Sequence, residues 1–167
     1  MLRKLIATSN DYAILVIRLA LAAVMFPHGM QKLLGWFGGY GFQATVEFFS
    51  SKLGVPAPVT VLVILAESLG AVALALGLVG RFMAFGIAAT MVGAVLMVHG
   101  HVGFFMNWSG QQGGEGYEYH LLALAMAAAV MIRGSGALSI DSVLGRRLGH
   151  ATVESADDVS ARPAVFA

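Results

Sequence analysis

Residues 58–79 read PVTVLVILAESLGAVALALGLV, residues 82–99 read FMAFGIAATMVGAVLMVH, and two residues, Gly80 and Arg81, separate the two runs. Each run is close to the length of about 20 residues that an α-helix needs to cross the hydrocarbon core of a bilayer. Glu67 is the one Asp, Glu, Lys or Arg residue in either run. The short connection forces the two helices to be antiparallel. The stretch therefore predicts a hairpin of membrane-spanning helices.

Two further apolar runs flank this hairpin in the sequence. Residues 12–34 follow Ser9, Asn10 and Asp11, which are residue types that favour a helix N-terminus. Residues 117–132 are closed by Arg133 and Gly134. We therefore expect an all-α membrane protein whose four transmembrane helices form an antiparallel bundle within residues 1–141.

The composition agrees with a membrane protein. Hydrophobic residues make up 58% of the 167-residue chain and charged residues 11%, and the mean hydropathy is +0.80. In a soluble protein, about a quarter of the residues are charged. A net charge of +1 argues against nucleic acid as a partner, and the absence of cysteine excludes disulfides and thiol catalysis.

Two segments outside the four runs have their own patterns. Within residues 35–57, Phe42, Val46, Phe49 and Leu53 recur at helical spacing between polar residues. This predicts a short amphipathic helix lying in the membrane interface between the first two spans. Residues 142–167 are more polar, and we expect a cytoplasmic tail that is disordered at its end.

The basic residues predict the orientation of the bundle. With the N-terminus inside, most of them fall on the inner side: Arg3, Lys4, Arg81, Arg133, Arg146, Arg147 and Arg162. The outer side then holds Lys32 and Lys52. This asymmetry favours a multi-pass protein with both termini in the cytoplasm.

Two charged residues, Arg18 and Glu67, fall inside the predicted spans. A charge there costs at least about 2.5–3.5 kcal/mol on insertion scales, so each needs a partner. We expect a buried Arg18–Glu67 ion pair, which either clasps two helices together or serves as a proton or ligand contact. The sequence identifies no catalytic residue.

Antiparallel folding of the spans predicts a gathering of polar residues at the outer level. His28 and Lys32 end the first span there, and Glu118 and His120 begin the fourth. They are either ordinary interfacial polarity or hydrogen-bond and proton donors to a polar headgroup, for which a quinone is suited. The spacing of these residues matches no recognised metal site, so we expect no metal.

Three stretches resemble the DoxX family of small bacterial membrane proteins: RLALAAVMFPHGMQKLLGWFGGYG (residues 18–41), ESLGAVALALGLVGR (67–81) and GEGYEYHLLALAMAAAVMIRGSGALSID (114–141). The resemblance implies a four-helix protein of the bacterial plasma membrane. Some relatives are associated with quinone-linked oxidoreductases or oxidative-stress complexes. The resemblance implies an involvement in quinone chemistry for six positions of this chain: Arg18, His28, Lys32, Glu67, Glu118 and His120.

The favoured function is a subunit or accessory of a quinone-linked membrane oxidoreductase or redox-stress system, with quinone as the candidate cofactor. No redox-cofactor motif is visible in the sequence, so a lone enzyme is less favoured. One alternative is a non-catalytic assembly subunit that docks a partner, and a less favoured one is a transporter of small solutes. The expected partners are the lipid bilayer, subunits of a redox complex and further copies of the chain.

Overall fold

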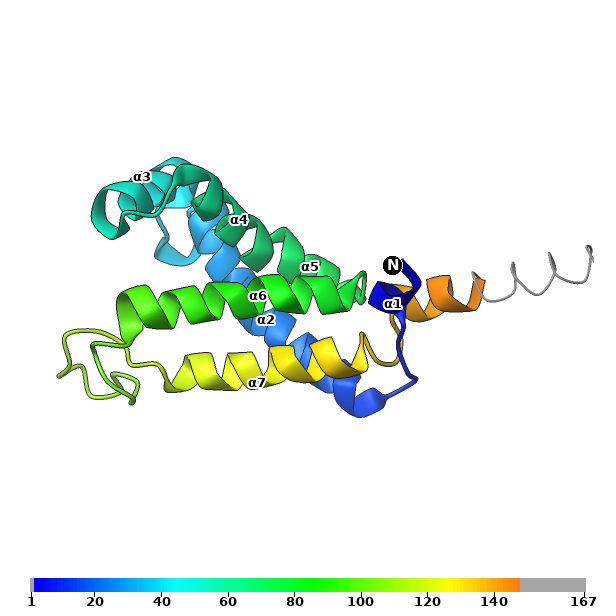
Figure 1. The fold of residues 1–167 in the computed structure, drawn as a ribbon. Coiled ribbons are helices and arrows are strands. Elements are labelled where there is room, and N and C mark those ends of the chain that lie inside the picture. The colour runs from blue at the N-terminus through cyan, green and yellow to red at the C-terminus, as the bar shows by residue number, and fades with distance from the viewer. Residues whose placement is uncertain (1, 148–167) are drawn as a thin grey trace, which may run out of the picture.

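The structure, a computed structural model, describes residues 2–147 (Figure 1). In this part of the chain the regular secondary structure is all helical, and loops connect the helices. Residues 140–147 are also helical, beyond the elements that carry labels. The labelled elements are α1 (Leu2–Ile6), α2 (Tyr12–Leu34), the 3₁₀ turn η1 (Trp36–Gly38), α3 (Gly41–Leu53), α4 (Ala57–Glu67), α5 (Leu69–Leu76), α6 (Gly80–Ala94), the π-helical turn η2 (Val95–His99) and α7 (Glu118–Arg133).

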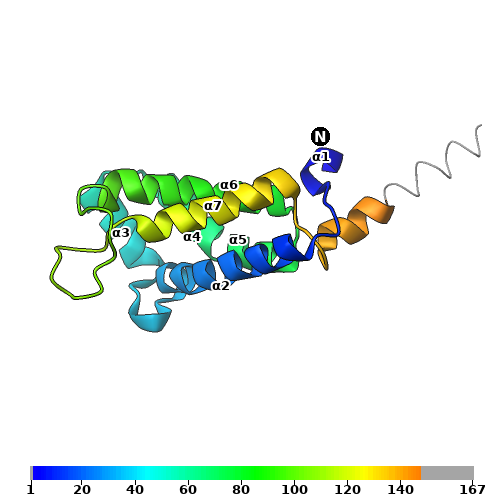
Figure 2. The ribbon, with the colours of Figure 1, turned by 90° about the horizontal axis from the view of Figure 1, so that it is seen from below.

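The long helices pack side by side. Figures 1 and 2 show α6 and α7 together, with α2, α4 and α5 against them. Helix α2 contacts α4, α5 and α7, and α6 contacts the same three helices. A core of small and aliphatic side chains fills the space between them and includes Leu21, Leu74, Ile87 and Ala127.

The two ends of the bundle differ. One end, which we call the terminal end, holds α1, the α5–α6 turn and residues 134–147 (Figure 1). The opposite end, the loop end, holds α3 and the connection of residues 100–117. This arrangement follows from the short hairpin at Gly77–Val79 and the longer connections elsewhere.

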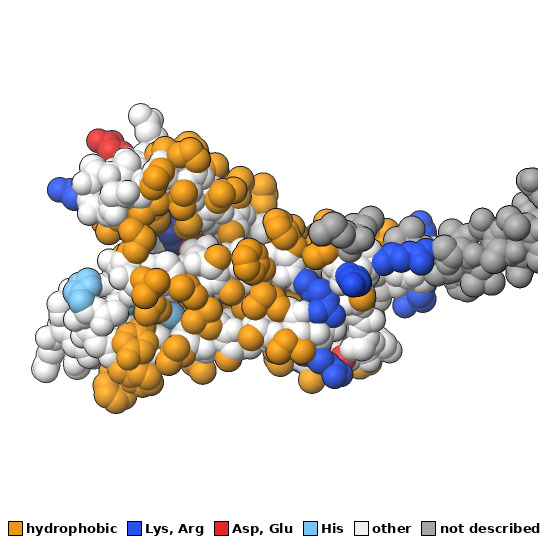
Figure 3. Space-filling view, in the orientation of Figure 1, with side chains coloured by type: hydrophobic (Ala, Val, Ile, Leu, Met, Phe, Trp, Pro, Cys, Tyr) orange, Lys and Arg blue, Asp and Glu red, His pale blue; other side chains and the backbone are white. Residues whose placement is uncertain are grey.

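Within residues 2–147, three helices are long and apolar enough to cross a membrane: Tyr12–Leu34, Ala57–Leu76 and Gly80–His99. They coincide with the first three predicted spans. The fourth predicted run forms α7, which has 16 residues and is shorter than the other three. Large apolar side chains are exposed along the helices, as Figure 3 shows in orange. Lipid is a suitable solvent for such a surface.

Local chemistry fixes the start of α2. The Asp11 carboxylate accepts hydrogen bonds from the backbone N–H groups of Ala13 (2.9 Å) and Ile14 (3.3 Å). Its other oxygen lies 3.1 Å from the guanidinium of Arg133 at the end of α7. The bond from Ile14, together with Arg133, holds the pKa of Asp11 below its usual value, although desolvation opposes this.

One feature differs from the sequence expectations. A helix, α3, does form where the amphipathic helix was predicted, but the polar residue Thr45 is its buried residue, and its hydroxyl donates to the Lys32 carbonyl at 3.4 Å. The domain boundary at residue 141, which lies in the helical segment 140–147, stays a prediction. The expected disorder at the end of the tail lies outside the described residues.

Candidate functional site

An ion pair lies between α2 and α4. The Nζ atom of Lys32 is 2.5 Å from Oε2 of Glu67. The Glu67 side chain is 4% exposed and that of Lys32 is 24% exposed. The sequence expectation that Arg18 would pair with Glu67 is therefore wrong. Arg18 lies 14 residues before Lys32 on α2, which is about 21 Å along a helix, so it belongs to the other end of the bundle.

The position of Glu67 depends on a break between α4 and α5. Ser68 has φ −96° and ψ −82°, and its hydroxyl donates to the Ile64 carbonyl at 2.6 Å. Such back-bonding by Ser bends helices. Gly29 of α2 lies directly against the break, because a Cβ atom there would be 2.3 Å from the Glu67 carbonyl oxygen. This close approach brings the end of α4 within reach of Lys32.

Aromatic and imidazole rings continue from this ion pair to α7. The ring of His28 is 6.0 Å from that of Tyr119, centroid to centroid, and the rings of Tyr119 and His120 are 5.3 Å apart. His28 lies one helical turn before Lys32 on α2. The His120 ring lies 4.2 Å from that of His99. We call His28, Lys32, Glu67, His99, Tyr119 and His120 the polar cluster.

His99 is placed by the π-helical turn at the end of α6. In η2 the backbone N–H of Gly100 donates to the carbonyl of Val95 at 2.7 Å, five residues earlier. Single π turns inside helices are frequent at functional sites. The Nδ1 atom of His99 is 2.8 Å from the Glu115 carbonyl. A carbonyl oxygen only accepts, so Nδ1 carries a proton, and in the neutral ring Nε2 is then free to accept one.

The polar cluster contains buried polar atoms that lack partners. Among the described residues, four buried side-chain atoms make no hydrogen bond within the chain, and two of them are the Tyr119 hydroxyl and Nδ1 of His120. The other two, in Arg18 and Thr60, lie elsewhere on α2 and α4. An unpaired buried polar group costs about 1–3 kcal/mol. Two such atoms on adjacent residues, Tyr119 and His120, mark a place where a ligand with polar atoms would be stabilised.

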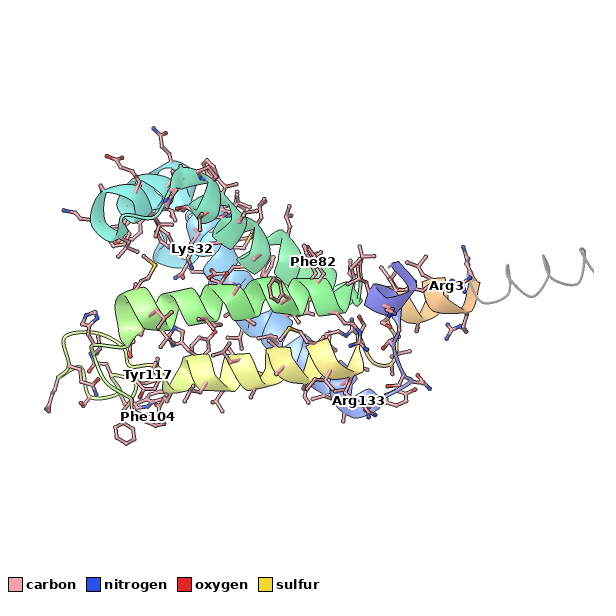
Figure 4. All side chains as sticks on the ribbon, in the orientation of Figure 1. Arg3, Lys32, Phe82, Phe104, Tyr117 and Arg133 are labelled. Carbon is pink, nitrogen blue, oxygen red and sulfur yellow. The ribbon has the colours of Figure 1, made fainter. Side chains whose placement is uncertain are left out.

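The surface is hollowed next to this cluster. Figure 3 shows a notch between α3 and α6, with basic atoms at its base, where Figure 4 labels Lys32. The side of the notch is formed by the apolar helices that would face lipid. The Lys32–Glu67 pair can therefore be approached from the side of the bundle.

Glu118 does not belong to the polar cluster, although the sequence placed it with His28, Lys32 and His120. Its Oε1 atom accepts from the backbone N–H of Met106 (3.0 Å) and from Nε1 of Trp108 (3.3 Å). It therefore organises the connection of residues 100–117. The other three candidates do come together. Within residues 2–147, no group of three or more His, Cys, Asp or Glu side chains is placed to hold a metal ion.

Sequence reasoning missed two members of the polar cluster as site residues. Neither Tyr119 nor His99 is among the site residues predicted from the sequence. The available signal was the order of the residues, because Tyr119 and His120 are adjacent and begin α7, the helix that is antiparallel to α6 and α2. The rotation of η2 that brings His99 to His120 has no signal in the local sequence.

Arg18 instead holds the terminal end together. Its Nη1 donates to the carbonyls of Leu74 (3.0 Å) and Ala75 (2.7 Å), at the end of α5. Its Nη2 donates to the carbonyls of Ala137 (3.3 Å) and Leu138 (3.4 Å). A cation is favourable at a helix C-terminus. The buried Arg18 thus joins α2, α5 and the segment that follows α7.

Asp141 complements Arg18 at the start of α6. Its carboxylate accepts from the backbone N–H groups of Val79 (2.8 Å) and Gly80 (3.0 Å) and from the hydroxyl of Ser135 (2.5 Å). An anion is favourable at a helix N-terminus. Gly77 completes this clasp, because its φ of +66° suits glycine and a Cβ would lie 2.5 Å from Nη1 of Arg18. The conspicuous residues of the terminal end therefore have structural roles.

Comparisons with known proteins agree with this architecture. Residues 13–100 match the model of the DoxX family. The chain is 25% identical over 144 residues to a protein of Bacillus subtilis (strain 168) named "Putative oxidoreductase CatD", and the match covers 85% of this chain and 96% of that protein. No solved structure matches the chain significantly. Because the family model covers more than half of the chain, the chain belongs to the DoxX family.

Proposed function

We propose that this DoxX-family membrane protein is a subunit or accessory of a quinone-linked oxidoreductase or redox-stress system of the bacterial plasma membrane. The observation that carries the proposal is the pair of unpartnered buried atoms, the Tyr119 hydroxyl and Nδ1 of His120, in the cluster that also holds the Lys32–Glu67 ion pair. A relative named as an oxidoreductase supports a redox role. The polar cluster is the proposed quinone site.

The proposal includes four spans and a fixed orientation. Helix α7 has 16 residues, about 24 Å of helix, and packs against α2 and α6. One further turn on either flank would bring it to the thickness of about 30 Å that a bilayer core requires. Helix α3, with Phe42 and Phe48 exposed beside Lys52, would lie in the interface.

Both termini would face the cytoplasm. Besides the buried Arg18, six basic residues lie at the terminal end within the described part of the chain, where the positive-inside rule places the cytoplasm: Arg3, Lys4, Arg81, Arg133, Arg146 and Arg147. A C-terminal reporter that matures only outside the cytoplasm should stay inactive. An active reporter would overturn this topology.

The chemistry of the polar cluster suits a quinone. A bound quinone supplies a carrier of two electrons and two protons whose carbonyl oxygens accept hydrogen bonds. The Tyr119 hydroxyl can donate to such a carbonyl, and so can Nδ1 of His120 when it is protonated. Glu67 and Lys32 can hold and exchange a proton beside them. His99, bonded to the Glu115 carbonyl of the exposed connection, offers a route for protons towards water.

Binding of menaquinone and ubiquinone to the purified full chain tests the site. Tyr119→Phe removes the unpartnered hydroxyl with little change of shape. We expect it to weaken binding about threefold to tenfold, because one hydrogen bond contributes about 0.5–1.5 kcal/mol. The matched control is Tyr117→Phe, since the ring of Tyr117 packs on Phe104 outside the cluster. Absence of saturable binding, or equal loss in both variants, would refute the quinone site.

The accessory role predicts protein partners. Solubilisation of native membranes in mild detergent, followed by affinity purification and mass spectrometry, should recover a redox enzyme or its subunits with the chain. Recovery of the chain alone, as a monomer or as copies of itself, would count against the role in a complex. It would leave the quinone site to be judged by the binding experiment.

A further inference from the structure

Helices α4 and α6 are in contact close to the end of α4. A Cβ atom at Gly86 of α6 would lie 3.5 Å from the Cβ atom of Ala66 on α4, which is ordinary van der Waals contact. A Cβ atom at Gly70 of α5 would likewise lie 3.8 Å from the sulfur of Met83 on α6. These contacts fix how the antiparallel helices face each other. Ala66, which immediately precedes Glu67, lies opposite Gly86.

From this contact the two helices separate towards the loop end. Residues seven apart lie on one face of a helix, about 10 Å apart along its axis. Gly93 is seven residues after Gly86, and a Cβ atom there would meet nothing within 4 Å among the described residues. Val59 is seven residues before Ala66, and it is 47% exposed. The facing sides of α4 and α6 are therefore open here, and Figure 1 shows α3 and α4 diverging from α6. We call the space between Val59 and Gly93 the lateral opening.

The lateral opening leads to the polar cluster. It lies at the notch that Figure 3 shows between α3 and α6, where the Lys32 side chain is 24% exposed. Both α2 and α6 contact α4 and α7, so the space between α4 and α6 leads inward to α2 and α7. These two helices carry Lys32, Tyr119 and His120 of the polar cluster. The opening therefore joins the cluster to the side of the bundle that faces lipid.

The walls of the lateral opening are apolar. Val59 stands on the α4 side, and Met97, one turn after Gly93 on the α6 side, is 46% exposed. The hydroxyl of Thr90 is satisfied within its own helix, because it donates to the Gly86 carbonyl at 3.1 Å. Apolar walls that lead to a few convergent polar groups are the usual composition of a ligand site. A ligand that suits this site has a polar head and a hydrocarbon tail.

We propose that the lateral opening holds the prenyl tail of a lipid-soluble quinone whose head group lies in the polar cluster. Gly93 is then a specificity-determining residue, because a larger side chain there would exclude the tail but not a head group without one. The inference rests on the proposed quinone site and adds the route of the tail. The quinone would enter sideways from the bilayer, so its tail would stay in an apolar environment throughout.

The test compares the binding of menaquinone-4, which carries a prenyl tail, with that of menadione, which has the same head group without it. Binding is measured on the full chain in lipid nanodiscs at a fixed ratio of lipid to protein, so that partition of each quinone into the bilayer is equal for all variants. Gly93→Leu should weaken the binding of menaquinone-4 about tenfold or more and that of menadione less than about threefold. The matched control is Ala20→Leu, which adds the same side chain at an exposed position of α2, 12 residues before Lys32. It should change neither affinity.

Two results would overturn the route of the tail but not the quinone site. The first is unchanged binding of menaquinone-4 by Gly93→Leu when Tyr119→Phe weakens it. The second is an equal loss of both quinones in Gly93→Leu, which would mean that leucine distorts the polar cluster. Absence of saturable binding of either quinone by the wild type would refute the quinone site itself, and the route with it.

A second variant covers the case in which Gly93→Leu does not fold, as circular dichroism would show. Val59→Phe narrows the lateral opening from the α4 side, at a residue that is already exposed. It should weaken the binding of menaquinone-4 about threefold or more and leave that of menadione unchanged. An unchanged affinity for menaquinone-4 would equally refute the route.

Discussion

Replacing Arg18 with Met tests whether this buried residue is structural. Met fills a similar apolar volume but removes the donors to the carbonyls of Leu74, Ala75, Ala137 and Leu138. The Leu74 carbonyl keeps a bond from the backbone of Gly77 at 2.9 Å. The other three carbonyls lose their side-chain donor.

The expected loss follows from these bonds. Hydrogen bonds inside membrane proteins average about 0.6 kcal/mol each, which gives a lower figure of about 2 kcal/mol for the clasp. Leaving buried carbonyls unpaired costs about 1–3 kcal/mol each, while removing a buried charge recovers part of this. We therefore expect Arg18→Met to lower the free energy of unfolding by about 2–5 kcal/mol. Arg18→Lys should lose about half as much, because one ammonium group cannot reach both pairs of carbonyls.

The assay is equilibrium unfolding of the purified chain in mild detergent with increasing SDS, followed by circular dichroism. Lys52→Met on the exposed face of α3 is the control for loss of a cation and should change stability by less than about 0.5 kcal/mol. The reasoning is refuted if Arg18→Met is as stable as the control. It is also refuted if that variant keeps its stability but loses quinone binding, since Arg18 would then act as a ligand contact.

Three further predictions concern α2. Gly29→Ala should destabilise the bundle by more than about 2 kcal/mol in the same assay, because its Cβ would meet backbone at 2.3 Å; Gly93→Ala, with open space around it, should be neutral or stabilising. Lys32→Met should cost more than Lys32→Met combined with Glu67→Leu, because the single change leaves a buried carboxylate unpaired; a coupling free energy near zero would mean that the ion pair is unimportant. Because the pKa of Asp11 is lowered in the folded state, its carboxylate adds stability at pH values above the usual pKa of 3.8, and this stability is lost as the pH falls through the folded-state pKa. The free energy of unfolding of the wild type should therefore exceed that of Asp11→Asn by a constant amount above pH 3.8, and by less below it. A difference that persists at low pH contradicts the assignment.

The sequence was sufficient for the positions of the long helices. An apolar run of 18 or more residues can satisfy its backbone only as a helix in lipid, so residues 12–34 became α2 and the next two runs became α4–α5 and α6–η2. The break at Ser68 was not predicted, because it depends on Gly29 of another helix allowing backbone contact. The π turn at the end of α6 escaped prediction for a similar reason, since its side chains have no distinctive pattern.

The sequence predicted at which end of the bundle the site residues lie, but not which of them contact one another. Antiparallel topology alone placed His28, Lys32 and His120 at one end of the bundle, and the structure brings them together. The partner of Glu67 was assigned wrongly, because two charges within predicted spans need not lie at the same level when the relative offset of the helices is unknown. For Glu118, the sequence predicted the end of the bundle but not the direction of the side chain. Its side chain follows the rotation of α7 and meets the backbone of the connection before it, which a one-dimensional pattern cannot reveal.

The contrast between the two ends supports the loop end as the place of the proposed quinone site. At the terminal end Arg18 and Asp141 are buried deeply, yet most of their polar atoms bond to backbone groups, so their burial is compensated within the chain. In the polar cluster Tyr119 and His120 bury polar atoms without compensation. Stability alone would favour phenylalanine in place of Tyr119, because the hydroxyl bonds to nothing inside the chain. A fold that keeps this hydroxyl buried beside an ion pair bears a cost that binding of a polar ligand would remove, and Tyr119→Phe should therefore raise stability slightly while it weakens binding.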